Sequence, residues 1–247
     1  MLASFFVAAA LALGVVALPE ASLGSAEVIY NCKVPNTAAL TFDDGPHEHT
    51  YHIVNTLEAA GAKGTFFFNG DNMGCIYSHE NRKRVKHAFY KGHQVASHTW
   101  RHADLSKLSW DEVHDEMWRV EQALQRIVGV TPAFMRPPYG SHNGLVRKVA
   151  HMRGQRIALW DLDSRDSMGA SHLESKGIFN EMIDRRPSTI LALNHETYAT
   201  TAYDVLPHAI RRLQDAGYNL VTLAECVGEE PYQKVGRPQK PNGDWHC

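Results

Sequence analysis

The sequence lacks several patterns that would assign a protein to a familiar class. Its 247 residues contain no Cys-x-x-Cys pair, no Asn-x-Ser/Thr sequon and no glycine-rich phosphate loop. These absences argue against a cysteine-based metal or redox motif, against N-glycosylation and against a nucleotide-binding fold. Charge is nearly balanced, with 25 basic and 27 acidic side chains and a formal net charge of −2. We therefore expect no basic surface for nucleic acid.

Long apolar runs are also absent, apart from one at the amino terminus. Residues 2–18 are almost wholly apolar, and Pro19 and Glu20 follow them. A run of about 17 residues is at the short limit for a membrane-spanning helix. We interpret residues 1–19 as a cleaved secretory signal peptide, with a retained membrane anchor as the alternative. The mature protein is then expected outside the cell or in the cell wall, without stable membrane insertion.

Secretion would allow the four cysteines to form disulfides. Four cysteines permit three connectivities. Cys32 precedes the first expected core strand and Cys226 follows the last one, so a fold that closes on itself makes them neighbours. We expect a Cys32–Cys226 bond, which leaves Cys75 to hold the carboxyl-terminal tail through Cys247.

The rest of the chain alternates between short apolar runs and amphipathic stretches. The expected strands are 37–42, 64–68, 93–97, 133–136, 156–160, 189–193 and 219–222. The expected helices are 50–60, 80–91, 110–128, 144–152, 173–185 and 203–216. Alternating strands and helices predict a parallel sheet, and seven strands favour a closed or nearly closed barrel over an open doubly wound sheet. We expect one domain over residues 20–247, in which 228–247 form a tail.

Two adjacent carboxylates follow the first core strand. Asp43 and Asp44 stand at the end of an apolar run, which Gly45 and Pro46 stop. Two like charges side by side are costly unless a metal, another cation or water stabilises them. The pair therefore predicts a cation site, although Asp-Gly-Pro is also ordinary turn chemistry.

The third and fourth strands are followed by further polar clusters. His98 and His102 are spaced by four residues, so on a helical turn both can reach one metal ion. Arg136 begins an Arg-Pro-Pro-Tyr-Gly segment and is able to hold a carboxylate in place. The prolines and Gly140 fix a backbone path that can direct a peptide N–H, such as that of Tyr139, toward a reacting oxygen. Solvated histidines and a plain proline turn are the competing interpretations.

The fifth and sixth strands complete the pattern. Asp161, Asp163 and Asp166 follow the fifth strand, and His195 follows the sixth. A lone histidine after a strand is more often structural than catalytic. Here it belongs to the fifth polar cluster at the same end of successive strands, where α/β folds place their active sites.

These five motifs, in this order, resemble those of the polysaccharide deacetylases of carbohydrate esterase family 4, which share the NodB homology domain. More narrowly, the chain is similar to secreted fungal chitin deacetylases over about residues 37–227. The resemblance implies a distorted (β/α)7-type barrel. It also implies that Asp44, His98 and His102 bind the metal and that Asp43 is the catalytic base.

The resemblance implies roles for the remaining motif residues. Arg136 matches the arginine that orients the base, and the Tyr139 backbone N–H matches the donor that stabilises the oxyanion. His195 matches the general acid, and Leu193 a wall of the pocket for the acetyl methyl. Asp163 best matches the aspartate that orients the histidine, with Asp166 second. Ser167 stands where the family commonly has tryptophan.

The implied activity is metal-dependent hydrolysis of the N-acetyl groups of chitin or chitin oligomers, which releases acetate and leaves glucosamine units. The implied metal is Zn²⁺, with another divalent ion such as Co²⁺ as an alternative. Acetylxylan and peptidoglycan are alternative substrates. A non-haem iron oxygenase and an inactive carbohydrate-binding wall protein are the alternatives from other classes. We expect a monomer whose partner is the polysaccharide.

Overall fold

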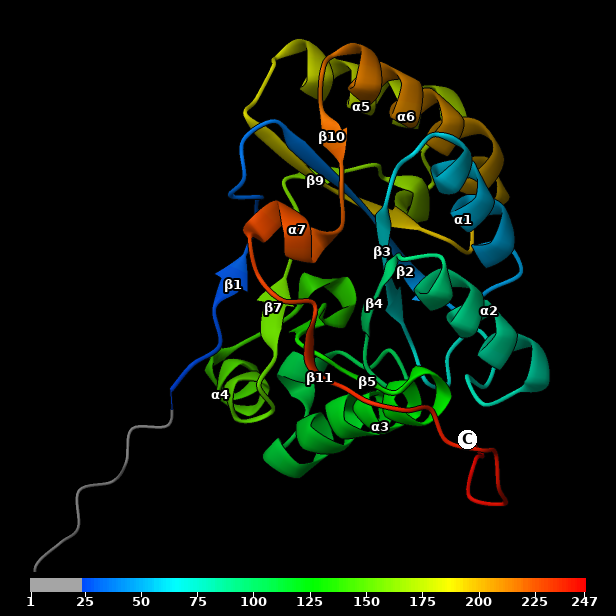
Figure 1. Cartoon of the computed structure of the whole chain (residues 1–247). Helices are drawn as coiled ribbons and strands as arrows, with labels where there is room; N and C mark the ends of the chain where they lie inside the picture. Colours follow the sequence, from blue (N-terminus) through cyan, green and yellow to red (C-terminus); the bar gives the residue numbers. More distant parts are fainter. Residues whose placement is uncertain (1–23) are drawn as a thin grey trace, which may run out of the picture.

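The computed structural model describes residues 24–247, so the expected signal peptide lies outside the described residues. One curved sheet forms the centre of the molecule (Figure 1). Its strands follow the order β1-β7-β6-β4-β3-β2-β9-β8, and all its pairings are parallel. Their bounds are β1 (Val28–Ile29), β2 (Thr37–Gly45), β3 (Gly64–Phe68), β4 (Gln94–Ser97), β6 (Phe134–Met135), β7 (Arg156–Ala158), β8 (Leu162–Asp163) and β9 (Thr189–His195).

The sheet is a half-barrel, which confirms the single-domain α/β barrel with the distortion that the resemblance implies. Strands β1 and β8 are the two ends of the sheet, and no pairing joins them within residues 24–247. A short strand, β10 (Asn219–Leu220), pairs with Thr37 and Ala38 at the start of β2. Strand β3 pairs with β2 only from Leu40 onward. The barrel is therefore open on one side.

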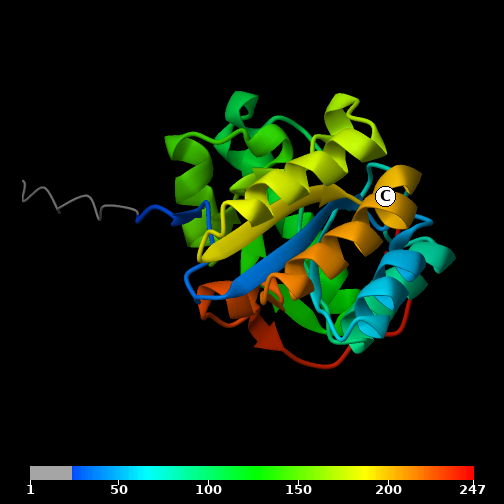
Figure 2. The same cartoon turned by 90° about the horizontal axis from the view of Figure 1, so that it is seen from above.

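Helices cover the outside of the sheet. They are α1 (Thr50–Ala59), α2 (His79–Tyr90), α3 (Trp110–Val128), α4 (Gly144–Met152), α5 (His172–Asp184), α6 (Leu206–Asp215) and α7 (Leu223–Val227). Viewed from above, α5 and α6 run along β9 and β2 (Figure 2). Each expected helix and strand has a counterpart in the structure. No helix among the described residues is long and apolar enough to cross a membrane.

Helix α3 illustrates how the local sequence sets an element. Ser109 and Glu112 form a capping box at its start, which satisfies free backbone N–H groups there. Gly129 follows its end with a φ of +84°, a conformation that suits glycine. The buried residues Val113, Met117 and Val120 recur at three- and four-residue spacing, so one face packs against the sheet.

The carboxyl-terminal region wraps back over the domain. Both expected disulfides, Cys32–Cys226 and Cys75–Cys247, are present. The expected tail contains a strand, β11 (Tyr232–Val235), which pairs antiparallel with β5 (Val130–Pro132). The sequence did not predict this pair, because strands of three or four residues are too short to show a clear period.

Candidate active site

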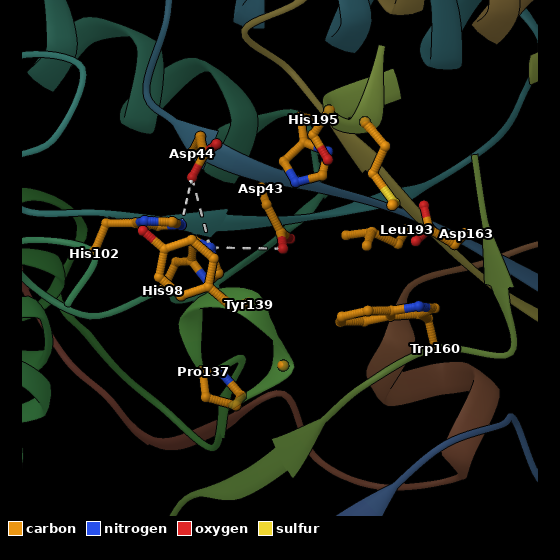
Figure 3. Close-up of a pocket in the computed structure, with 13 residues that line it drawn as sticks. Asp43, Asp44, His98, His102, Pro137, Tyr139, Trp160, Asp163, Leu193 and His195 are labelled. Atoms are coloured by element: carbon orange, nitrogen blue, oxygen red, sulfur yellow. Dashed lines mark ion pairs between the residues drawn. The ribbon is translucent and has the colours of Figure 1, made fainter. Parts of the chain in front are cut away.

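The expected site residues meet at the carboxyl ends of the parallel strands. Asp43 at the end of β2 is directly opposite His195 at the end of β9, and His98 follows β4. Together they border a cavity of about 440 Å³ (Figure 3). The cavity is lined by Asp43, Asp44, His98, His102, Pro137, Tyr139, Gly140, Trp160, Asp163, Ser167, Met168, Leu193 and His195. The parallel register places Asp43 beside His195, and the loops that follow the strands supply the other walls.

The three residues of the expected metal site form a compact cluster. Asp44 Oδ1 lies 3.6 Å from His98 Nε2 and 3.2 Å from His102 Nε2. Zinc bonds to nitrogen or oxygen of about 2.0–2.2 Å in a tetrahedral site place ligand atoms about 3.3–3.5 Å apart. The cluster therefore fits a single zinc-sized ion with a coordination position left open.

The buried His98 is held in the tautomer that a metal ligand requires. Its Nδ1 donates a hydrogen bond to the backbone carbonyl of Arg136 at 2.8 Å, which leaves Nε2 unprotonated and facing Asp44. Burial lowers the pKa of His98 to about 3, against the opposing effect of the Asp44 charge. The imidazole is therefore neutral at physiological pH.

Asp43 is held by a buried arginine. Arg136 is fully buried, and its Nη1 donates to Asp43 Oδ1 at 2.7 Å. The guanidinium also donates to Thr41 Oγ1 and to the carbonyls of Ala158 and Leu159, so its position is fixed on every side. Burial raises the pKa of Asp43, and the charge of Arg136 acts in the opposite direction. The result is a fixed carboxylate whose second oxygen, Oδ2, lies 3.7 Å from His98 Nε2.

The structure corrects the expected partner of His195. His195 Nδ1 donates to Asp166 Oδ1 at 2.7 Å, and the His195 backbone N–H donates to Asp166 Oδ2 at 2.8 Å. Asp166, the second choice of the sequence analysis, therefore takes the place expected for Asp163. Strand β8 ends at Asp163, and the chain turns back through Arg165, whose φ is +57°. That turn brings Asp166 against the histidine, while Asp163 accepts a hydrogen bond from the Arg165 N–H.

The contact with Asp166 changes the proton affinity of His195. Burial alone would lower the pKa of this imidazole. The hydrogen bond and charge of Asp166, helped by the charge of Asp43, outweigh burial and raise the pKa of His195 to about 9. The imidazole is therefore protonated at neutral pH and able to donate a proton from Nε2.

The remaining walls of the cavity include residues that the sequence analysis singled out and others that it missed. Tyr139 has a φ of +61°, and the residue is 72% exposed. Leu193 forms part of the apolar wall. Trp160 and Met168 line the cavity together with Ser167, which stands where the family commonly has tryptophan. Trp160 ends the expected strand 156–160, directly before the cluster of Asp161, Asp163 and Asp166, and that position was the signal that could have identified it.

Comparison with known proteins assigns the chain. Residues 30–158 match the family model described as polysaccharide deacetylase. A chitin deacetylase of Pestalotiopsis sp is 35% identical over 210 residues, which cover 85% of this chain and 70% of that protein. The chain belongs to the polysaccharide deacetylase family. It is a deacetylase hydrolase, and the oxygenase and binding-protein alternatives are set aside.

The names of other relatives refer to two different polymers, chitin and peptidoglycan. A chitin deacetylase of Colletotrichum lindemuthianum is 32% identical, over 82% of this chain and 84% of that protein. The solved structure of the chitin deacetylase from this fungus aligns with a TM-score of 0.81 and 30% identity, over 86% of this chain and 96% of that one. A peptidoglycan-N-acetylglucosamine deacetylase of Listeria monocytogenes is 32% identical, over 80% of this chain and 40% of that protein. Polysaccharide N-deacetylation is the activity that these names share.

Proposed function

We propose that this deacetylase removes the acetyl group from N-acetylglucosamine units of chitin or chitin oligomers. One observation carries the proposal: the Asp44–His98–His102 cluster shares a cavity with Asp43 and His195, which are held from behind by Arg136 and Asp166, respectively. A cation site, a base and an acid are the groups that amide hydrolysis needs. The names of the relatives from Pestalotiopsis and Colletotrichum favour chitin.

The chemistry of the cluster fits Zn²⁺, which Asp44, His98 and His102 would hold. When bound, zinc supplies a Lewis acid that polarises the acetyl carbonyl and increases the acidity of a water molecule. Co²⁺ is an alternative, because it accepts the same nitrogen and oxygen ligands.

The side chains around the cluster move the protons. Asp43 accepts a proton from the attacking water while Arg136 holds the carboxylate in position. The water oxygen forms a bond to the acetyl carbon, and the backbone N–H of Tyr139 stabilises the negative charge that develops on the carbonyl oxygen. His195 then donates a proton to the sugar nitrogen as the carbon–nitrogen bond breaks. Acetate and a free amine are the products, and Leu193 contacts the acetyl methyl.

We also propose that the protein is secreted and acts as a monomer outside the cell or in the cell wall. The two disulfides support this location, because such bonds persist in oxidising compartments. Detection of the protein in culture medium or wall fractions, with an amino terminus near residue 20, would test both the location and the signal peptide.

The test of the activity is acetate release from chitin oligomers, acetylxylan and peptidoglycan in parallel, before chelation, after chelation and after return of zinc. Zinc-restored release from chitin oligomers alone is the expected result. Release only from peptidoglycan, the second candidate because of relatives such as the Listeria protein, would keep the chemistry and change the substrate. No acetate from any polymer in the presence of zinc would refute the proposal.

A further inference from the structure

A buried glutamate that the proposed reaction does not use follows the general acid. Glu196 is fully buried, and its backbone N–H donates to the carbonyl of Asp43 at 3.1 Å. Its side chain reaches the same turn further along, where Oε1 accepts a hydrogen bond from the backbone N–H of His47 at 2.7 Å. A single residue at the end of β9 thus contacts the chain on both sides of Asp44.

The segment between these two contacts has an unfavourable backbone conformation. Asp44 has a φ of +70°, which a residue with a side chain keeps only when its surroundings hold it there. A Cβ atom on the next residue, Gly45, would lie 2.1 Å from Glu196 Oε1. The carboxyl group of Glu196 therefore packs directly on the turn, and only glycine fits opposite it.

The hydrogen-bond pattern fits a neutral carboxylic acid. Thr50 Oγ1 lies 2.6 Å from Glu196 Oε1 and 2.7 Å from the carbonyl oxygen of His47. A hydroxyl has one proton to donate and a carbonyl oxygen can only accept. The Thr50 proton therefore goes to the His47 carbonyl, and the contact with Glu196 is a hydrogen bond when Glu196 carries a proton and donates it to Thr50 Oγ1. Glu196 Oε2 is buried without a partner among residues 24–247, which is also less costly for a neutral group.

The electrostatic surroundings agree with this geometry. Burial raises the pKa of Glu196 to about 8, while the contact with the Thr50 hydroxyl and the hydrogen bond from the His47 N–H act in the opposite direction. The nearby charge of Asp44 raises the pKa of Glu196 further, and that of Arg84 lowers it.

We propose that Glu196 is a positioning residue, whose neutral carboxyl group holds the 44–50 turn and thereby fixes Asp43 and Asp44 relative to His195. Figure 3 shows Asp43 between the other two side chains, so a displaced turn would disturb both the base and the metal ligand. The proposal rests on the proposed function for the roles of these three residues. Glu196 itself does not touch the reacting atoms.

Three substitutions test this role. Glu196→Gln keeps the reach and the acceptor oxygen without a charge, Glu196→Asp keeps the acid but is one methylene shorter, and Glu196→Ala removes the group. We expect Glu196→Gln to keep kcat and zinc affinity within about 3-fold. We expect Glu196→Asp and Glu196→Ala to lower kcat by about 10–100-fold with little change in KM, and to weaken zinc binding by about 10-fold. Acetate release and zinc titration of the same preparations supply the two readouts.

A matched control separates positioning from general destabilisation. Glu121 is another buried glutamate, which accepts hydrogen bonds from Arg153 and Gln155 away from the cavity. We expect Glu121→Ala to lower the melting temperature but to leave the kcat and zinc affinity of the folded protein unchanged. If Glu196→Ala does not fold, Glu196→Gln and Glu196→Asp decide the question. Gly45→Ala, which crowds the same carboxyl group, should reproduce the loss of kcat.

Several results would overturn the inference. Unchanged kcat and zinc affinity in Glu196→Asp or Glu196→Ala would remove the positioning role. Equal losses in Glu196→Gln and Glu196→Ala, or in Glu196→Ala and Glu121→Ala, would have the same consequence. If the wild-type protein released no acetate, the proposed function would fail. The zinc affinities of the variants would still test whether Glu196 fixes Asp44.

Discussion

Asp43 and Asp166 are both almost completely buried, with exposed fractions of 2% and 6%, yet their pKa values shift in opposite directions. Burial raises the pKa of Asp43, and the charge and hydrogen bond of Arg136, together with the charges of His195 and His102, oppose this only in part. Burial also acts to raise the pKa of Asp166, but the hydrogen bonds and charge of His195, together with the Thr201 hydroxyl, hold the pKa below its ordinary value. The same residue type therefore has two proton affinities in one site.

The difference arises from the number of hydrogen-bond donors that each carboxylate receives. Asp166 accepts hydrogen bonds from the ring and backbone of His195, from Thr201 and from the Ser167 N–H. Asp43 accepts one from Arg136 and borders the cavity. A carboxylate with an accessible oxygen can receive a proton, whereas one saturated with donors remains ionised and orients its neighbour. The comparison thus predicts which aspartate is the base and which supports the acid.

The largest expected effect follows loss of the base. Asp43→Asn should lower kcat by about 10²–10⁴-fold, because an amide cannot accept the proton of the attacking water. Zinc affinity should stay within a few-fold of the wild type, since Asp44, His98 and His102 are retained. Steady-state acetate release and zinc titration measure the two quantities. Full activity of this variant would remove Asp43 from the mechanism.

The next effect concerns the carboxylate beside the acid. Asp166→Asn should lower kcat by about 10²-fold or more, because the imidazole loses its charged partner. The pKa of His195 should fall from about 9 toward the ordinary value of 6.5. The protonated acid would then be lost at lower pH, so the alkaline limb of the kcat–pH profile should move to lower pH.

Asp163→Asn is the matched comparison for Asp166→Asn. Asp163 borders the same cavity but makes no hydrogen bond to His195 in the described part of the chain. Its substitution should leave the alkaline limb in place. A shift of that limb in Asp163→Asn and not in Asp166→Asn would reverse the assignment that the structure supports.

A third effect concerns stability. The pKa of His195 is higher in the folded protein, at about 9, than its ordinary value of 6.5. The folded state therefore holds the proton more tightly, so this contribution to stability is fully present below about pH 6.5 and is lost as the pH rises through 9. For the metal-free protein the loss should be at most about 3 kcal/mol. Denaturant unfolding at several pH values measures it, and Asp166→Asn should flatten the dependence.

The smallest effects come from single hydroxyl groups. Thr201→Val removes one donor from Asp166, and Thr41→Val removes one acceptor from Arg136. Each should reduce the free energy of unfolding by about 1–2 kcal/mol. Only Thr201→Val should move the alkaline limb of the kcat–pH profile, because Thr41 has no contact with the Asp166–His195 pair. Equal shifts in both variants would mean that the two carboxylates are not independent.

Much of this architecture follows from short stretches of sequence. Apolar runs ending in polar residues predicted the parallel strands, and amphipathic stretches predicted the helices between them. The shared orientation of parallel strands then predicted that Asp43, His98 and His195 lie at one edge. These inferences succeeded because each depends on a local pattern, together with one general property of parallel sheets.

The tertiary structure alone decided the finer assignments. Asp163 and Asp166 are chemically identical, and their order along the chain does not reveal which one contacts His195. The turn through Arg165 decides it, with a positive φ that its residue type does not predict. No sequence pattern singled out Glu196, and only its burial against the 44–50 turn revealed its contacts. The sequence determined which strands deliver the reactive groups, because strand patterns are local. The proton affinities and hydrogen-bond partners of those groups were decided by the tertiary structure, because they depend on contacts between residues more than 25 positions apart.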